Sequence, residues 1–152
     1  MEQSAKEIMN NYMKEISLFQ DLLNCIIRER DHLINQDVKG IWDSLEEKES
    51  ILASIEQNRS LMKDIENGDS SSMEIAPQDR DRIREHSRAL ARLKLEIKSR
   101  VKENVTFINE TISFFHEMIS AMTMSEIDKS NSYGPSGFSR RGPRSAIYQG
   151  EV

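Results

Sequence analysis

The sequence predicts an all-α fold of three long antiparallel helices, an up-down-up bundle or coiled coil with a flexible C-terminal tail. Apolar residues recur at steps of three and four over most of the chain, which places them on one face of a helix. All three prolines lie at or after position 77, so little interrupts a helix before that point. The chain is 37% hydrophobic and 31% charged, which is typical of a small bundle of amphipathic helices.

The first helix is expected over about residues 3–35. Ser4 followed by Glu7 matches a capping box at its start. Ile8 and Leu22 lie beside the main apolar stripe, which indicates contact with more than one neighbour. The stripe itself keeps a heptad spacing: Met9, Tyr12, Ile16, Phe19, Leu23, Ile26, Arg30 and Leu33.

The second helix is expected over about residues 37–67, after a short polar break. Asp37 is a suitable N-cap, and Gly68 is placed to end the helix. A connection this short forces the first two helices into an antiparallel hairpin. Trp42, in the first turn of the second helix, is expected to pack near the bend of this hairpin.

The third helix is expected over about residues 77–127, with Pro77 at its start and no Gly or Pro within it. At 1.5 Å per residue it would be on the order of 70 Å long, against roughly 45 to 50 Å for each of the others. Its residues past about Glu110 should therefore have little intramolecular cover. The alternative is a kink near Asn104 and Thr106, after which a fourth short helix folds back over the same residues.

The uncovered end of the third helix is apolar, so it predicts a partner or weak self-association. Several of its residues are methionines, whose flexible side chains adapt to partner surfaces of different shape. The candidate partner-binding residues are Phe107, Ile108, Ile112, Phe114, Phe115, Met118, Ile119, Met122, Met124 and Ile127.

Charge and composition bound the function further. Residues 130–152 hold three arginines against one glutamate, a local +2, so the rest of this chain of net charge −5 sums to −7. An acidic body argues against general nucleic-acid binding. The lone Cys25 excludes an intramolecular disulfide, and the sequence contains no signal peptide and no 18-residue apolar span. We therefore expect a cytoplasmic protein without membrane insertion: a bundle over residues 1–129 and a tail over 130–152 that orders on a partner.

No catalytic motif is present, and neither a metal site nor a cofactor site is expected. The sequence has no phosphate-cradling Gly-rich loop, no Cys/His pair at ligand spacing and no nucleophile elbow. His32, His86 and His116 are far apart in the chain. His86 is the candidate for a phosphotransfer histidine on a helical bundle, but the surrounding EHSRALARLKL lacks the small residue after a nearby lysine that lets the phosphate approach. The sequence therefore does not predict an enzyme.

The segment after the third helix carries a specific likeness. Tyr133, Gly134 and Gly137 in SYGPSG, after three antiparallel helices, resemble the FlgN-type flagellar export chaperones. The run 48–59 in the second helix, together with Asn104, Ile108 and Ile112, is similar to the pattern of that family.

The resemblance implies an ATP-independent chaperone that binds the C-terminal helical regions of hook-associated junction proteins. It also implies delivery of these clients to the flagellar export gate, with docking of the segment around Tyr133, Gly134 and Gly137 on the export-gate membrane protein. The sequence also allows two other functions. The heptads could build a coiled-coil scaffold or adaptor that self-associates, and the basic tail could bind nucleic acid.

Overall fold

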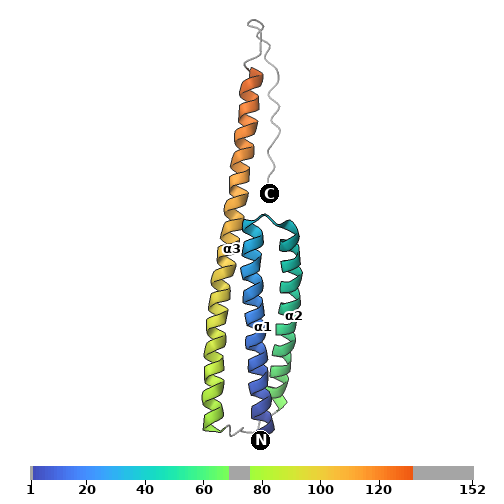
Figure 1. The fold of residues 1–152 in the computed structure, drawn as a ribbon, viewed down its shortest axis with the longest axis vertical. Coiled ribbons are helices and arrows are strands. Elements are labelled where there is room, and N and C mark those ends of the chain that lie inside the picture. Colours follow the sequence, from blue (N-terminus) through green and yellow to red (C-terminus); the bar gives the residue numbers. More distant parts are fainter. Residues whose placement is uncertain (1, 69–75, 132–152) are drawn as a thin grey trace. The chain divides into compact units, whose positions relative to one another are not determined.

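Three α-helices form the part of the chain that the computed structural model describes, residues 2–68 and 76–131. They are α1 (Glu2–Ile34), α2 (Val38–Gly68) and α3 (Pro77–Asn131). The chain runs up α1, down α2 and up α3 (Figure 1), and none of the described residues forms a strand. α3 has 55 residues against 33 and 31 for the other two. The predicted all-α, up-down-up fold with the third helix longest is confirmed.

The chain divides into two compact units, Met1–Thr111 and Ile112–Val152. The first unit contains α1, α2 and the first part of α3, and the described part of the second unit is the remainder of α3. α3 is one continuous helix, so the alternative with a break near Asn104 and Thr106 and a fourth helix is wrong. The tail expected over residues 130–152 lies outside the described residues from position 132 onward.

A tight turn joins α1 to α2. The backbone N–H of Asp37 donates to the carbonyl of His32 at 2.9 Å and that of Gln36 to Leu33 at 3.3 Å, while Gln36 has a φ of 56°. These bonds make a Schellman motif, which satisfies carbonyls at the end of α1. The Asp37 Oδ1 atom then accepts the Gly40 N–H at 3.0 Å, as expected of an N-cap. A Cβ atom at Gly40 would collide with the His32 ring, so a larger residue there would require the His32 side chain to move.

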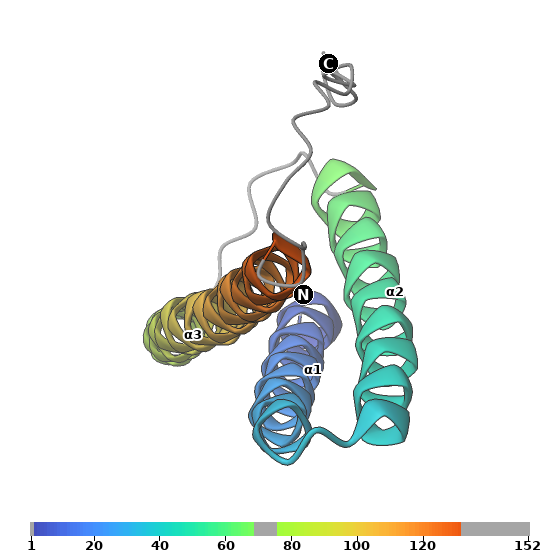
Figure 2. The same cartoon turned by 90° about the horizontal axis from the view of Figure 1, so that it is seen from above.

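α1 is the middle helix of the first unit and lies between α2 and α3 (Figures 1 and 2). α1 and α2 approach closely because small side chains line their contact: Cys25 Sγ donates to the carbonyl of Ser44 at 3.4 Å, and both residues are buried. The core combines residues of all three helices: Phe19, Leu22, Ile26, Ile55 and Leu90, with Ile16, Leu18, Ile51, Leu93 and Ile97 half-buried against them.

A chain of polar contacts ties the three helices together. Lys48 Nζ on α2 lies 2.6 Å from Glu29 Oε1 on α1. The other oxygen of Glu29 accepts the Asn104 Nδ2 of α3 at 3.3 Å, and the same amide donates to the Ile26 carbonyl at 3.2 Å. Asn104 is only 4% exposed. A buried polar side chain at such a position fixes the register of α3 against α1.

The expected packing of Trp42 is wrong. Its side chain is 62% exposed, because the face of α2 that meets α1 runs through Ile41, Ser44 and Ile55 instead. Among the described residues, no helix is both long enough and apolar enough to cross a membrane.

Candidate functional site

One row of α3 positions, spaced by steps of three or four residues, meets α1 in the first unit. We call this row the α3 seam. Leu90 and Asn104 are buried in it, and Leu93 and Ile97 are half-buried against the core. The seam positions are Leu90, Leu93, Ile97, Val101, Asn104, Ile108, Thr111, Phe115, Met118 and Met122.

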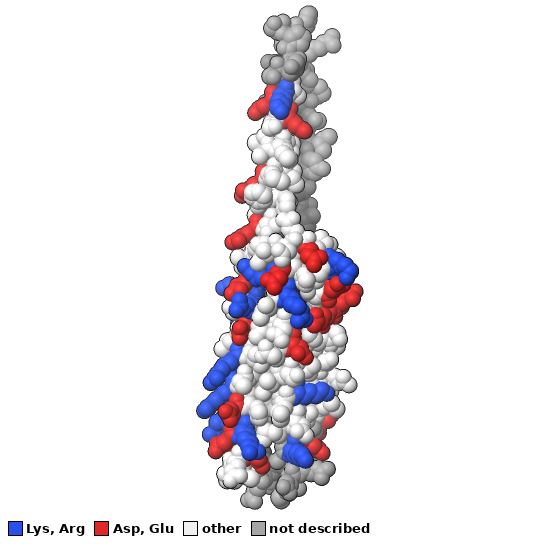
Figure 3. All heavy atoms as spheres, in the orientation of Figure 1, with Lys and Arg blue, Asp and Glu red and all other residues white. Residues whose placement is uncertain are grey.

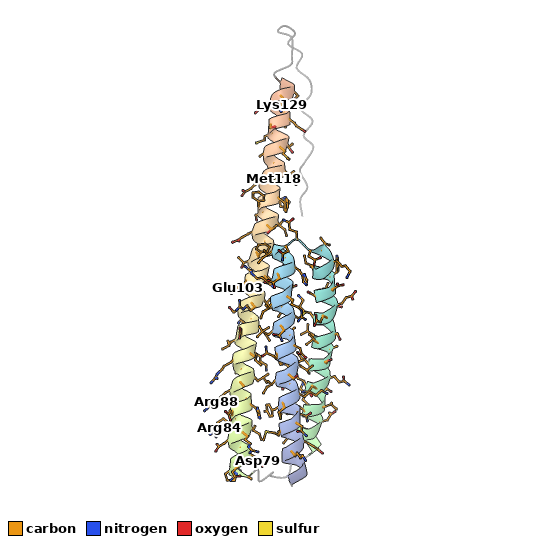
Figure 4. All side chains as sticks on the ribbon, in the orientation of Figure 1. Asp79, Arg84, Arg88, Glu103, Met118 and Lys129 are labelled. Atoms are coloured by element: carbon orange, nitrogen blue, oxygen red, sulfur yellow. The ribbon has the colours of Figure 1, made fainter. Side chains whose placement is uncertain are left out.

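The seam continues into the second unit, where its side chains are uncovered. Every residue from 112 to 130 is exposed. Phe115 is 48% exposed, Met118 39% and Met122 59%, and Figure 4 labels Met118 on this part of the helix. The periodicity that buries Leu90 in the first unit therefore leaves large apolar side chains in contact with solvent in the second.

The partner-binding residues predicted from the sequence do not all share this environment. Phe107 and Ile108 belong to the first unit. The Arg30 guanidinium lies 5.5 Å from the centre of the half-buried Phe107 ring, and Arg30 Nη1 donates to the Glu103 carbonyl at 3.2 Å. Phe107 therefore already has a cation–π partner within the chain.

Within the second unit, most of the predicted residues share one broad face of the helix. At about 100° per residue, Met124 and Ile127 lie outside it. Phe114 and Phe115 contact each other edge to face, with ring centroids 6.1 Å apart and an interplanar angle of 64°. We call the shared set the second-unit face: Ile112, Phe114, Phe115, Met118, Ile119 and Met122.

Charge is distributed unevenly along α3. Residues 80–102 include nine lysines and arginines, and Arg84 and Arg88 project away from α1 (Figure 4). Residues 104–128 include no lysine or arginine, only Glu110, Glu117, Glu126 and Asp128. Figure 3 shows this part of the helix as mostly uncharged, with acidic side chains along an edge. The second-unit face is therefore apolar and bordered by negative charge.

The export-gate residues predicted from the sequence, Tyr133, Gly134 and Gly137, lie outside the described residues. Sequence reasoning also missed the contact of Glu29 with Lys48 and Asn104. One feature of the sequence could have indicated this contact: the polar residue Asn104 occupies a seam position where the pattern predicts an apolar residue.

Local contacts account for the shifted pKa values among the described ionisable groups. None of them forms a group of three or more His, Cys, Asp or Glu able to hold a metal ion. The hydrogen bond from the Gly40 N–H, with help from His32 at 3.0 Å, lowers the pKa of the Asp37 carboxyl. Burial, reinforced by the nearby Glu47 carboxylate, raises the pKa of the Cys25 thiol. The first effect stabilises a helix cap, and the second makes a buried thiol less reactive.

A helical bundle whose longest helix carries an uncovered apolar face has the features of a protein that binds helices of other proteins. The chain belongs to the FlgN family: residues 1–141 match the family described as FlgN protein. No curated protein and no solved structure gives a significant match. Membership identifies the chain, in general terms, as a flagellar export chaperone that binds flagellar proteins, and it confirms the family suggested by the sequence.

Proposed function

We propose that this chaperone uses its second-unit face to bind the C-terminal helical regions of hook-associated junction proteins. The observation that carries the proposal is the exposure of every residue from 112 to 130 on a helix that keeps its apolar periodicity. An amphipathic helix of a client can cover such a face with its own apolar side chains. Membership of the FlgN family supports flagellar proteins as the class of client.

Binding would follow the pattern of the first unit, where α1 covers the α3 seam. Phe114 and Phe115 are the proposed anchors, because buried aromatic side chains dominate the energetics of protein interfaces. Met118 and Met122 can adjust to the shape of the client helix. Covering the assembly surface of the client keeps it unassembled in the cytoplasm until export, and this holding role needs no nucleotide.

Delivery to the export gate is the second part of the proposal. We assign docking on the export-gate membrane protein to Tyr133, Gly134 and Gly137, and the family resemblance of this segment supports the assignment. In a pull-down with the cytoplasmic domain of that membrane protein, Tyr133→Ala should reduce retention while client binding stays unchanged. Retention equal to that of the wild type would contradict the assignment.

Isothermal titration with a C-terminal client fragment tests the binding face. The double variant Phe115→Ala/Met118→Ala should bind at least about tenfold more weakly, because it removes one aromatic anchor and a methionine beside it on the second-unit face. Circular dichroism should stay nearly unchanged, since both side chains are exposed in the free protein.

The matched control is Met124→Ala, which removes a methionine that lies outside the second-unit face and is 71% exposed, against 39% for Met118. It should change the affinity by less than about twofold. Equal weakening by both sets of substitutions, or loss of helix in the double variant, would contradict the proposed face.

A self-associating scaffold remains the competing function, and light scattering at two protein concentrations separates the two. A chaperone should be a monomer or a weak dimer without client, whereas a scaffold should be a stable oligomer at both concentrations. The acidic border of the second-unit face favours the monomer, because two copies would bring like charges together.

A further inference from the structure

Basic side chains line the face of α3 that points away from α1 in the first unit, where Figure 4 labels Arg84 and Arg88. At about 100° per residue, this face covers an arc of about 120° opposite the α3 seam. Within that arc of residues 80–102, Asp81 is the only acidic residue. The row is about 33 Å long at 1.5 Å per residue. We call it the basic face: Arg80, Arg84, Arg88, Arg92, Lys98 and Lys102.

The charges of the basic face are largely unpaired. Elsewhere in the first unit, Arg28 lies 2.6 Å from Glu47, and Lys48 lies 2.6 Å from Glu29. On the basic face, Arg84 alone forms an ion pair with another described residue, at 3.8 Å and with both side chains exposed. All six members of the face are exposed. The face therefore presents a row of positive charge that the described part of the chain does not neutralise.

The opposite side of the first unit is acidic. α1 lies between α2 and α3 (Figures 1 and 2), and Figure 3 shows basic side chains gathered along the outer side of the first part of α3. Lys39, on the outward face of α2, is paired with Asp43 at 2.8 Å. Because the two signs are separated, the net charge of −5 does not keep the basic face from an anionic surface. The acidic residues on the outward face of α2 are Asp43, Glu46, Glu49, Glu56 and Asp64.

We infer that the basic face binds the anionic headgroups of a lipid bilayer, with the first part of α3 lying flat on the membrane. A straight row on the outside of a helix can meet a flat surface along its whole length. Clusters of about four to eight Lys and Arg residues on a helix suit anionic lipids, because each charge near the surface adds to the attraction. The acidic side of α2 then faces away from the bilayer.

A protein partner fits the basic face less well. Protein interfaces have an apolar core that is fully buried, and the basic face offers one large apolar side chain, Leu95, which is 69% exposed. A bilayer needs no such core, because headgroup charge alone attracts the basic residues. Leu95 lies between Arg92 and Lys98 in the middle of the row. It can enter the headgroup region of a bilayer, whereas the phosphate backbone of a nucleic acid has no apolar surface for it.

Vesicle flotation with the full chain tests the inference. The chain should float with vesicles of phosphatidylglycerol mixed with phosphatidylcholine and should not float with pure phosphatidylcholine. Flotation should fall as the salt concentration rises toward about 0.15 M, because ions screen exposed charges. The triple variant Arg88→Gln/Arg92→Gln/Lys98→Gln should bind the anionic vesicles at least about tenfold more weakly. Glutamine preserves the helix, since it is a good helix former.

The matched control removes the same amount of charge elsewhere. Lys6, Lys14 and Lys63 are exposed lysines of α1 and α2. Lys6→Gln/Lys14→Gln/Lys63→Gln should change vesicle binding by less than about twofold, because these side chains lie outside the basic face. Equal weakening by the two triple variants would overturn the inference, since net charge alone would then explain the binding.

Tryptophan fluorescence gives the second readout. Trp42, the only tryptophan of the chain, is 62% exposed on α2. Its emission should not shift when anionic vesicles are added to the wild type, because α2 faces away from the bilayer. In the variant Leu95→Trp/Trp42→Phe, the emission should shift to shorter wavelength as the indole enters the headgroup region. No shift at position 95, or a shift of Trp42 instead, would overturn the inference.

Other occupants give different results. Equal binding to phosphatidylcholine vesicles would assign membrane contact to the apolar second-unit face, and tighter binding to a DNA duplex or to polyglutamate at the same salt would assign the basic face to another polyanion. Each result would overturn the inference. The proposed function is tested separately, because the variant Arg88→Gln/Arg92→Gln/Lys98→Gln should bind a client fragment as the wild type does.

Discussion

The two parts of α3 share one periodic pattern of apolar residues, but the first part buries these residues and the second part exposes them. In the first unit the seam buries Leu90 and Asn104 against α1, and in the second unit it exposes Phe115, Met118 and Met122. The difference lies in what accompanies the seam. The first part packs beside α1, and the second has no neighbour among the described residues. A repeated pattern can therefore stabilise a fold in one segment and provide a binding surface in the next.

Substitutions in the two units should therefore change the free energy of unfolding by different amounts. Removing a buried side chain costs free energy of unfolding, because a cavity remains. Removing an exposed one from the second-unit face should cost almost no stability, because its burial occurs only with a partner. Four predictions follow from that division.

The largest expected effect is in the core of the first unit. Ile26 is 2% exposed, so Ile26→Ala should lower the free energy of unfolding by about 2–5 kcal/mol. Urea denaturation followed by circular dichroism measures the loss. Phe115→Ala should change the same quantity by less than about 0.5 kcal/mol. A loss for Phe115→Ala as large as that for Ile26→Ala would remove the distinction between the two units.

A smaller loss is expected when the polar contact among the helices is broken. Glu29→Ala removes one of the two acceptors of the Asn104 amide and also removes the carboxylate that pairs with Lys48. Asn104 and Lys48 are both largely buried, so we expect the free energy of unfolding to fall by about 1–3 kcal/mol in urea denaturation. Glu46→Ala, on an exposed part of α2, is the control and should be nearly neutral. Equal losses of stability for the two variants would show that the contacts of Glu29 with Lys48 and Asn104 do not hold α3 in place.

The helix cap should add a small, pH-dependent term. Because the folded pKa of Asp37 is lowered, its contribution to stability is present above the unfolded pKa of about 3.9. It is lost as the pH falls through the folded value. Asp37→Asn keeps an N-cap side chain but removes the charge, so its melting temperature should be slightly below that of the wild type at pH 7. The gap should close as the pH falls below about 4, and a gap that widens there would contradict this sign.

The smallest expected effect is on the reactivity of Cys25. Its thiol is buried and its pKa is raised, so a thiol reagent should label the native chain slowly and the urea-unfolded chain rapidly. Phe115→Ala/Met118→Ala should leave the native labelling rate unchanged, because the second-unit face does not stabilise the first unit. Faster labelling in this variant would show that the second-unit face does stabilise the first unit, which would contradict the prediction.

Local patterns predicted most of the fold. Periodicity located the helices, and Asp37 marked the start of α2, because both signals act over a few residues. The prediction for Trp42 was wrong because the face that α2 buries is set by α1, a different helix, whose Cys25 meets Ser44 rather than Trp42. The tie of Glu29 to Lys48 and Asn104 was missed for the same reason, since it joins residues distant in sequence. The exposed apolar end of α3 was predicted from a difference in helix lengths, which periodicity and helix-end signals were enough to give.

Hydrogen exchange along α3, with and without a C-terminal client fragment, tests the central claim most directly. An exposed helix without packing is marginally stable in water, so amides 112–127 should exchange fast in the free chain. Amides 90–104 should already be protected. Client should slow exchange at 112–127 strongly and at 90–104 little. Protection of 112–127 in the free chain, or no change there on adding client, would contradict the account.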